Sequence, residues 1–297
     1  MLKILLCCLL ILLKVTIIRS ILPLKDPPNE FIQQMERDGI SLERFYVDDS
    51  NQGNGTHYMY SQLSVNTYIK NMDQIINKVK LLIERKVDKN IVLHQVQKQH
   101  WIIIALLQLQ EEYSISLKNK NVLIIGSTEP WLESICIVLG ASNITTIDYN
   151  NLTYHNEKIK TFSKYDFDMF YNNSGPYINS YDFVIGLRSF DHSGLGRYGD
   201  IIDYNADIDS INKAKMMLKN NGIFIFTVPI GRDLVIWNLQ RRYGSIRLPK
   251  LLGNGFHELN RLGWKNELFD ANNDYRKTYE PVFIQQKRSL AANDNEL

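Results

Sequence analysis

A glycine and an acid at the ends of two short runs of β-forming residues are spaced to bind a nucleoside. Val122–Ile125 ends at Gly126, and Ile144–Ile147 ends at Asp148, 22 residues after the glycine. Parallel strands joined by a helix end at the same edge of a sheet, so the glycine turn can approach a nucleotide while the acid reaches a ribose hydroxyl. The alternative is a plain strand–helix turn, in which Pro130 suits the first helical position. The predicted cofactor-binding residues are Gly126, Ser127, Glu129, Asp148 and Tyr149.

The loop Arg188–Asp200, RSFDHSGLGRYGD, carries the densest set of reactive side chains. It follows the apolar run Tyr181–Leu187, so we expect it at the carboxyl edge of the sheet, where open α/β folds bind ligands. His192 could act as a general base, because imidazole titrates near neutral pH, and an acid of the same loop could orient it. The alternative is a structural glycine loop held by an Arg–Asp pair. The predicted catalytic residues are Asp191, His192 and Asp200.

Arginine and aromatic side chains in two segments indicate where a substrate would bind. The same loop supplies two of them, and the segment Gly231–Gly255 supplies the others. We expect this segment to be an insertion with a short helix between Asp233 and Gly244. Guanidinium groups bind anions through paired donors, so a small molecule or a glycan-like substrate is expected. A solvated helix face with one packed Trp is the alternative. The predicted substrate-binding residues are Arg197, Tyr198, Trp237, Asn238 and Arg241.

Runs of β-forming residues place these side chains on an α/β sheet. The predicted strands are Val122–Ile125, Ile144–Ile147, Ile159–Phe162, Tyr181–Leu187, Ile223–Val228, Glu267–Phe269 and Pro281–Gln285. One predicted helix follows the first strand and ends at Gly140, and another spans Asp207–Leu218. We predict a Rossmann-like, mostly parallel sheet whose last two strands form an antiparallel hairpin.

Two helices are predicted before the sheet, and they form a helical extension at residues 67–115. Tyr68–Arg85 repeats apolar residues at three- and four-residue steps, and the centre of Ile91–Gln110 is apolar on every face. His94 and His100 lie six residues apart and therefore on different faces of the second helix. We predict no metal site.

The composition indicates a folded protein with a single large domain, which we place at residues 116–288. The chain is 44% apolar and 22% charged, which is ordinary for a packed core. Its net charge of +2 argues against a protein that binds nucleic acid through bulk charge. Residues 23–66 are expected to be a polar linker or stalk with a short helix near Glu30–Asp38, and residues 289–297 a disordered tail.

The first 22 residues are typical of a signal peptide or a signal anchor. Lys3 precedes the apolar run Ile4–Leu13, which is short for a membrane span. We therefore expect the secretory pathway, with either a cleaved signal or an N-terminal membrane anchor. Only Cys136 lies outside this segment, so no internal disulfide can form. Among four N-x-S/T sites, Asn54 is the favoured position for glycosylation.

Residues 121–264 resemble the domain-of-unknown-function family 268, first defined on nematode proteins. The resemblance is carried by the segments VLIIGSTEPWLE, TTIDYN, SFDHSGLGRYGD, LKNNGIFIFTVPIGRD and WNLQRRYGSIRLP. The family is similar to class I S-adenosylmethionine-dependent methyltransferases, so the resemblance implies a methyltransferase-type sheet and S-adenosylmethionine as the cofactor. It places Gly126 and its turn by the methionine part of this cofactor and Asp148 by the ribose. The chain has GSTEP where those enzymes have G-x-G-x-G, and Ile124 where they have an acid.

These observations leave two functions open. The first is a methyltransferase-like enzyme, which would transfer the sulfonium methyl group to a nucleophile held near Asp191, His192 and Asp200. Such a reaction needs positioning and, for a hydroxyl acceptor, removal of a proton. The second is a non-catalytic Rossmann-like binding module of the secretory pathway, which the missing glycines favour. A nicotinamide oxidoreductase would need G-x-G-x-x-G, which the chain lacks.

Overall fold

The computed structural model describes residues 23–85, 89–164, 177–253, 255–271, 274 and 278–289. The predicted signal segment at residues 1–22 and all but the first residue of the predicted tail lie outside these ranges. Within the described ranges, no helix combines the length and the apolar character needed to cross a membrane.

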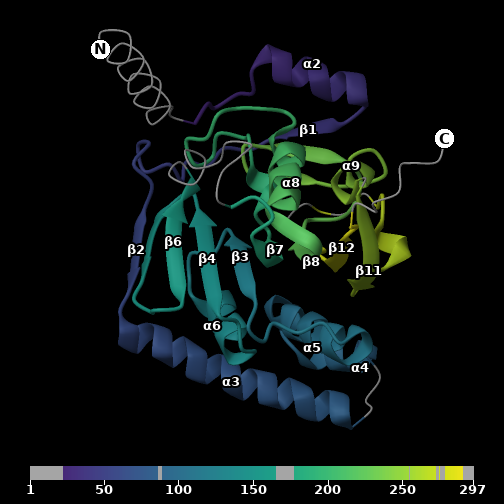
Figure 1. Cartoon of the computed structure of the whole chain (residues 1–297). Coiled ribbons are helices and arrows are strands. Elements are labelled where there is room, and N and C mark those ends of the chain that lie inside the picture. Colours follow the sequence, from purple (N-terminus) through teal and green to yellow (C-terminus); the bar gives the residue numbers. More distant parts are fainter. Residues whose placement is uncertain are drawn as a thin grey trace, which may run out of the picture.

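A seven-stranded sheet forms the centre of the molecule, with strand order β11-β12-β8-β7-β3-β4-β6 (Figure 1). The strands are β3 (Asn121–Ile125), β4 (Asn143–Asp148), β6 (Ile159–Ser163), β7 (Tyr181–Leu187), β8 (Leu218–Thr227), β11 (Phe256–Leu262) and β12 (Val282–Lys287). The adjacent strands β6, β4, β3, β7 and β8 run parallel. β12 lies between β8 and β11 and is antiparallel to both. The predicted α/β fold, a Rossmann-like sheet of methyltransferase type with an antiparallel C-terminal hairpin, is confirmed.

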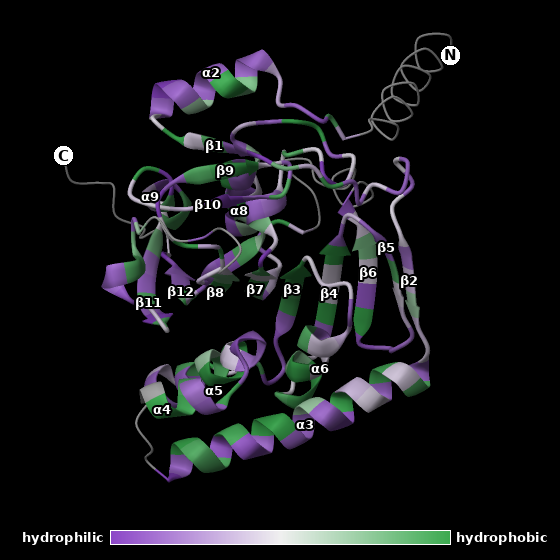
Figure 2. Cartoon of the chain, turned by 180° about the vertical axis from the view of Figure 1, so that it is seen from behind, coloured by the Kyte–Doolittle hydropathy of each residue, from purple (hydrophilic) through white to green (hydrophobic). Residues whose placement is uncertain are grey.

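Helices cover both faces of this sheet, which explains why its central strands are apolar on both sides. Along β3, Val122 and Ile124 face one core, while Leu123 faces a second core. The first core is covered by α3 (Gln62–Glu84), α5 (Trp101–Tyr113) and α6 (Trp131–Val138). The second is covered by α8 (Ala206–Met217) and α9 (Leu248–Leu252). Figure 2 shows apolar and polar positions alternating along α3.

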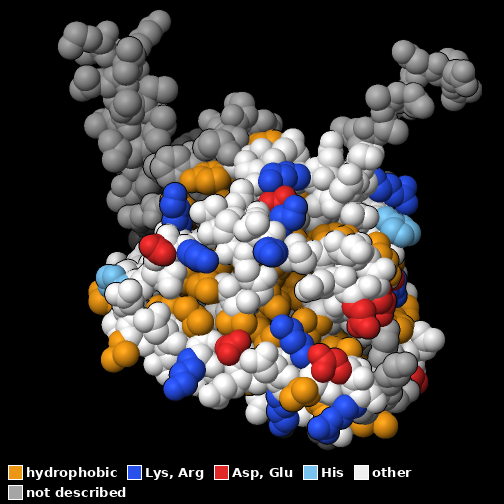
Figure 3. Space-filling view, turned by 60° about the horizontal axis from the view of Figure 1, so that its bottom comes forward, with side chains coloured by type: hydrophobic (Ala, Val, Ile, Leu, Met, Phe, Trp, Pro, Cys, Tyr) orange, Lys and Arg blue, Asp and Glu red, His pale blue; other side chains and the backbone are white. Residues whose placement is uncertain are grey.

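The predicted N-terminal helical extension is confirmed. α3 begins after Ser61, whose hydroxyl accepts a hydrogen bond from the Ser64 N–H (3.2 Å), and packs against α6. The second predicted helix is divided, because α4 (Lys89–Gln95) and a short 3-10 turn precede α5. The face of the molecule that carries this extension shows apolar side chains among charged ones (Figure 3).

Residues 23–66 are not a polar linker, because the structure packs them onto the rest of the chain. α2 (Asn29–Asp38) occurs where a short helix was predicted, and it buries Phe31 and Met35 in a cluster with Trp237. Two short strands pair in parallel with distant ones, β1 (Ser41–Arg44) with β9 (Leu234–Trp237) and β2 (His57–Tyr60) with β5 (Asn151–Tyr154). The prediction of a polar linker was wrong because β1 and β2 pair with strands far along the chain, and such pairing leaves no pattern in the local sequence.

The segment Gly231–Gly255 contains a hairpin where a helix was expected. β9 and β10 (Gln240–Arg242) pair antiparallel and form a three-stranded sheet with β1. All four residues of β9 are buried, and its two β-branched residues favour a strand. The helix lies later, at α9. Asp233 supports the turn before that helix, where its carboxylate accepts hydrogen bonds from the N–H groups of Gly244 and Arg247.

The first strand of the C-terminal hairpin is β11, whereas Glu267–Phe269, predicted to be that strand, lies at a 3-10 turn (Asn266–Leu268). β11 is at the edge of the sheet and is buried only at its two ends. All its middle residues except Leu259 are polar, and they give none of the apolar alternation that indicates a strand.

Candidate cofactor and substrate site

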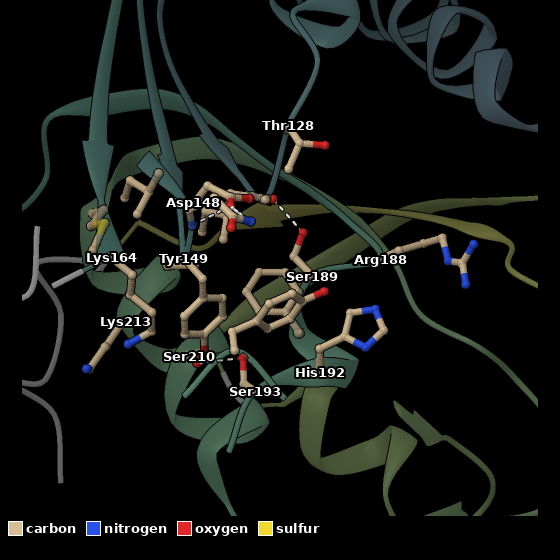
Figure 4. A pocket seen from close by; sticks show the side chains of 18 residues that line it. Thr128, Asp148, Tyr149, Lys164, Arg188, Ser189, His192, Ser193, Ser210 and Lys213 are labelled. Carbon is tan, nitrogen blue, oxygen red and sulfur yellow. Dashed lines mark hydrogen bonds between the residues drawn. The ribbon is translucent and has the colours of Figure 1, made fainter. Parts of the chain in front are cut away.

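A cavity of about 210 Å³ lies at the carboxyl ends of β3, β4 and β7, with α8 on its far side (Figure 4). Both lysines that Figure 4 labels, Lys164 and Lys213, lie on the side of Tyr149 away from Arg188 and His192. Five of the residues proposed from the sequence line this cavity: Gly126, Asp148, Tyr149, His192 and Tyr198. Three segments far apart in the chain, after β3, at the end of β4 and after β7, therefore line the same cavity.

Gly126 follows β3 in the left-handed region, with φ of 75°. A Cβ atom there would overlap the hydroxyl of Ser189, which donates a hydrogen bond to the carbonyl oxygen of Ile125 (2.6 Å). The turn thus needs glycine both for its conformation and for the approach of the segment after β7. Glu129 does not line the cavity, and its carboxylate accepts a hydrogen bond from Tyr68 of α3 (3.2 Å).

A fully buried carboxyl group, Glu133, supports this turn from α6. Its Oε1 accepts a hydrogen bond from Thr146 Oγ1 (2.7 Å), and its Oε2 lies 3.1 Å from Ser127 Oγ. Burial raises the pKa of Glu133 to about 7, although the hydroxyl hydrogen bonds oppose this rise. Ser127 is buried below the cavity and does not line it. The only signal in the sequence was a single acid within the apolar stretch WLESICIV.

The hydroxyl of Ser127 has two acceptors within reach but one hydrogen to donate. These acceptors are the Glu129 carbonyl oxygen (2.9 Å) and the Glu133 carboxyl group. A protonated Glu133 can donate to Ser127 Oγ while Ser127 donates to Glu129, so every hydrogen bond is formed. A neutral Glu133 therefore matches this geometry better than a carboxylate.

Asp148 and Tyr149 form the wall of the cavity at the end of β4. Asp148 Oδ1 accepts hydrogen bonds from the backbone N–H and the side-chain amide of Asn150 (2.8 and 2.9 Å). Burial raises the pKa of Asp148, and the Asn150 hydrogen bonds limit that rise. The ring of Tyr149 stacks on Tyr198, with centroids 5.1 Å apart and planes 12° apart. An acidic group and an aromatic face thus stand side by side, which suits a ribose and a base.

The ring of His192 is positioned by groups of the chain at both nitrogens. Its Nδ1 lies 2.6 Å from the carbonyl oxygen of Leu239, and its Nε2 lies 3.5 Å from a carboxylate oxygen of Asp191. Asp191 is fully buried and, among the described residues, its oxygens accept no hydrogen bond. The short contact to Leu239 marks Nδ1 as the donor nitrogen, and the other nitrogen is turned toward the buried Asp191.

Asp200 has a structural task in the same loop. Its carboxylate accepts hydrogen bonds from the backbone N–H groups of Gly194 (2.7 Å) and Tyr198 (3.2 Å). It is buried and lines neither cavity described here. Of the two acids predicted to orient His192, the structure places Asp191 beside the ring and uses Asp200 to shape the loop.

A second, outer cavity of about 680 Å³ adjoins the first. The two cavities share Arg188, His192 and Tyr198 as lining residues. Arg197 also lines the outer cavity, and its Nε and Nη2 both contact Asp49 at 2.7 Å. The sequence had placed Arg188 only at the start of the loop and gave it no role.

Three residues proposed for substrate binding have structural roles instead and line neither cavity. Trp237 is fully buried and donates a hydrogen bond to the carbonyl oxygen of Leu24 (3.0 Å). Asn238 bonds both the N–H and the carbonyl oxygen of Val47. These two side chains attach the N-terminal segment, whose packing the sequence did not reveal.

Arg241, the third of these residues, belongs to a buried hub with Asp207 and Arg247. Arg241 donates to the carbonyl oxygens of Ser193 and Tyr204, and Arg247 contacts the Asp207 carboxylate through Nε (2.8 Å) and Nη2 (2.5 Å). Burial alone would raise the pKa of Asp207, but the two guanidinium groups hold it below the ordinary value. The hub joins β10, α8 and the turn before α9.

Solved structures with a related fold are distant from this chain. The 1,6-didemethyltoxoflavin-N1-methyltransferase of Burkholderia thailandensis, solved with 1,6-didemethyltoxoflavin and S-adenosylhomocysteine, matches 62% of this chain and 77% of its own at 12% identity, with a TM-score of 0.44. An S-adenosylmethionine-dependent methyltransferase of Mesorhizobium loti matches 62% and 98% at 9% identity, with a TM-score of 0.38. The cyclase SpnF matches 62% and 80% at 14% identity, with a TM-score of 0.39. No curated protein matches the chain in sequence.

One family model matches most of the sheet domain. Its description is "Caenorhabditis protein of unknown function, DUF268", and the match covers residues 119–290, from just before β3 to one residue beyond the last described one. The resemblance that the sequence motifs indicated is therefore confirmed over more than half of the chain. The protein belongs to the DUF268 family.

Proposed function

We propose that the inner cavity binds S-adenosylmethionine and that the protein is a methyltransferase-like enzyme. The observation that carries this proposal is the convergence of Gly126, Asp148 and Tyr149 on one cavity at the carboxyl edge of the sheet. Asp148 would hold the ribose, Tyr149 would offer its ring to the base, and the turn after β3 would lie by the methionine part.

The chemistry of these residues fits that cofactor, with one condition on Tyr198. At about 210 Å³ the cavity is smaller than common ligand pockets, which begin at about 300 Å³. The Tyr198 ring covers the face of Tyr149 that a base would use. Tyr198 must therefore turn aside when a nucleoside enters. When bound, S-adenosylmethionine would supply an electrophilic methyl group.

Calorimetric titration of the full-length protein with S-adenosylhomocysteine tests this proposal. We expect saturable heat at one site and a rise in the melting temperature with ligand concentration. Adenine, which lacks the ribose and the amino acid, serves as the control and should bind more weakly. An absence of both heat and thermal shift at millimolar S-adenosylhomocysteine would refute cofactor binding.

A second candidate is a non-catalytic Rossmann-like binding module. The geometry of His192 favours it, because both ring nitrogens face acceptors of the chain. The Tyr149–Tyr198 stack over the small cavity favours it too. Binding of S-adenosylhomocysteine without methyl transfer to any acceptor tested would support this function over the enzymatic one.

We also propose that the protein enters the secretory pathway and is glycosylated at Asn54. Lys3 and the apolar run after it support entry, and Asn54 lies exposed in a turn before β2. Asn143 is exposed as well, but its side-chain amide donates to Asn121. Expression in animal cells should give a product whose mobility shifts on removal of N-glycans. Asn54→Gln should remove this shift, whereas Asn143→Gln should leave it; an unshifted wild-type protein would refute the proposal.

A further inference from the structure

We propose that the outer cavity binds an organic acid and that the methyl group is transferred to its carboxylate oxygen. This inference rests on the proposed function, because it names the acceptor for the same site. It depends on the side chains that line the outer cavity, on the groups that hold them, and on the contacts that turn the described acids and the histidine of the site toward the chain.

The lining of the outer cavity favours an anion with an apolar body. Two arginines and His192 line it, and no described lining residue is an acid. A Phe, a Tyr and a Leu supply apolar surface in the same cavity: Phe45, Tyr198 and Leu239. A planar guanidinium donates to both oxygens of a carboxylate at once, which makes a carboxylate the best match among common anions.

Two acids near this cavity form ion pairs with its arginines and orient them. Glu280 contacts Nε of Arg188 (3.1 Å), and Asp49 contacts Nε and Nη2 of Arg197 (2.7 Å each). Burial raises the pKa of Glu280, and the charge of Arg188 opposes that rise. Arg188 meets its acid through Nε, so its terminal nitrogens can reach a ligand, whereas Arg197 already directs Nη2 to Asp49 and Nη1 to the Leu239 carbonyl oxygen (3.5 Å). Such support pre-organises a binding group for a ligand.

Arg188 is the residue placed to hold the acid beside the cofactor. It lines both cavities, and its side chain is half exposed. Its backbone adopts φ of 54°, a conformation that costs energy for a residue with a Cβ atom. Its N–H donates to the hydroxyl of Thr227 on β8 (3.1 Å), which fixes this conformation. Figure 4 shows its guanidinium on the same side of the inner cavity as His192.

The described acids and the histidine of the site are turned toward other groups of the chain. His192 faces an acceptor at each nitrogen, and Asp191 is fully buried beneath it. Asp200 is bound to the loop backbone, and Asp148 to Asn150. A hydroxyl or ammonium acceptor needs a base, whereas a carboxylate is already ionised at neutral pH. The site is therefore better suited to an acceptor that attacks as an anion.

The reaction balances without any proton transfer. A carboxylate oxygen forms a bond to the methyl carbon as the bond between that carbon and the sulfonium sulfur breaks. The products are a methyl ester and S-adenosylhomocysteine. The positive charge of the sulfonium and the negative charge of the carboxylate cancel in the transition state, so a cavity that excludes water favours the step.

Binding of benzoate to the full-length protein saturated with S-adenosylhomocysteine tests the acceptor class. Benzamide is the control, since it has the same ring and shape without the charge. We expect benzoate to bind at least about ten-fold more tightly, and Arg188→Gln to remove this preference while Arg188→Lys keeps part of it. Arg261→Gln is the matched variant, because Arg261 pairs with Glu258 and lines neither cavity. Equal binding of benzoate and benzamide by the wild-type protein would overturn the inference.

Methyl transfer gives a second readout, which needs no variant. The full-length protein is incubated with methyl-labelled S-adenosylmethionine and a mixture of aromatic and aliphatic carboxylic acids. We expect label that mild base releases as methanol, the signature of a methyl ester. Label that resists base would overturn the inference while leaving the proposed function intact. A protein that binds no S-adenosylhomocysteine would instead refute the proposed function.

Discussion

Two regions of this molecule bury an acid completely, and they treat its charge in opposite ways. In the hub between α8 and β10, two arginines hold the pKa of Asp207 below its ordinary value. Under the turn after β3, the partners of Glu133 among the described residues are hydroxyl and backbone groups, and burial raises its pKa to about 7. Burial alone therefore does not decide the charge of an acid; the partners do.

The two acids consequently respond to pH in opposite directions. Asp207 stabilises the fold above its unfolded pKa, and this stability is lost as the pH falls through its lowered folded pKa. Glu133 binds a proton more tightly in the folded state, so its contribution is complete below its unfolded pKa. That contribution is lost as the pH rises to about 7. At neutral pH, Asp207 therefore keeps its contribution to the stability of the fold, whereas Glu133 loses its contribution.

Removal of one arginine from the hub should have the largest effect. Arg247→Met leaves the buried charge of Asp207 with Tyr243 at 3.0 Å and Arg241 at 3.8 Å. We expect the free energy of unfolding to fall by about 3–5 kcal/mol, the usual result of breaking a buried ion pair. Urea unfolding measures this loss. Arg44→Met, which breaks an exposed pair with Asp26, is the control and should cost at most about 1 kcal/mol. Equal losses in the two variants would contradict the structural role of the hub.

Glu133→Gln should have a smaller effect that depends on pH. The amide of Gln can donate to Ser127 and its oxygen can accept from Thr146, so the variant imitates protonated Glu133. In the wild-type protein, the rise of the Glu133 pKa from 4.5 to about 7 lowers the free energy of unfolding by about 3 kcal/mol between those pH values. Unfolding curves of both proteins from pH 4.5 to 8 would show this difference. Parallel pH profiles would mean that Glu133 is ionised in the folded protein.

The central sheet could be predicted from the sequence, whereas the packing of residues 23–66 could not. The sheet was predictable because β3, β4 and β7 contain runs of β-forming residues that end in a turn, as at Ile125 and Ile147. The packing of residues 23–66 was not, because β1 and β2 are four-residue strands whose partners lie in other parts of the chain. Strand pairing over such distances depends on the folded sheet and leaves little trace in the local sequence.

Site residues, too, were predicted correctly where they lie at the ends of strands. Gly126, Asp148 and His192 were found because each follows a strand, and strand ends meet at one edge. Trp237 and Arg241 were assigned to a substrate because their residue types suit one, but they are fully buried structural residues. Residue type suggests a chemistry, and only burial and partners separate Arg241 from the half-exposed Arg188.

Asp148→Asn tests the cofactor side of the comparison, with an expected effect on binding rather than on stability. Asn can still accept from Asn150, so the fold should be kept, but it lacks the charge that binds a ribose hydroxyl. We expect S-adenosylhomocysteine to bind about ten-fold more weakly, or about 1.4 kcal/mol, with an unchanged melting temperature. Asp209→Asn, an exposed acid on α8, is the matched control. A collapse of the melting temperature in Asp148→Asn would make Asp148 structural, like Asp207.

Tyr198 should show the smallest effect and the opposite sign. Its ring stacks on Tyr149 in the structure, so a nucleoside must displace it before its base can stack there. An aromatic pair contributes about 0.5–1.5 kcal/mol, so Tyr198→Ala should tighten the binding of S-adenosylhomocysteine by about 2- to 10-fold. Tyr198→Phe keeps the stack and should leave the affinity unchanged. Weaker binding by Tyr198→Ala would show that the ring moves with the ligand and becomes part of its binding wall, so that the small cavity reflects a closed arrangement of a larger site.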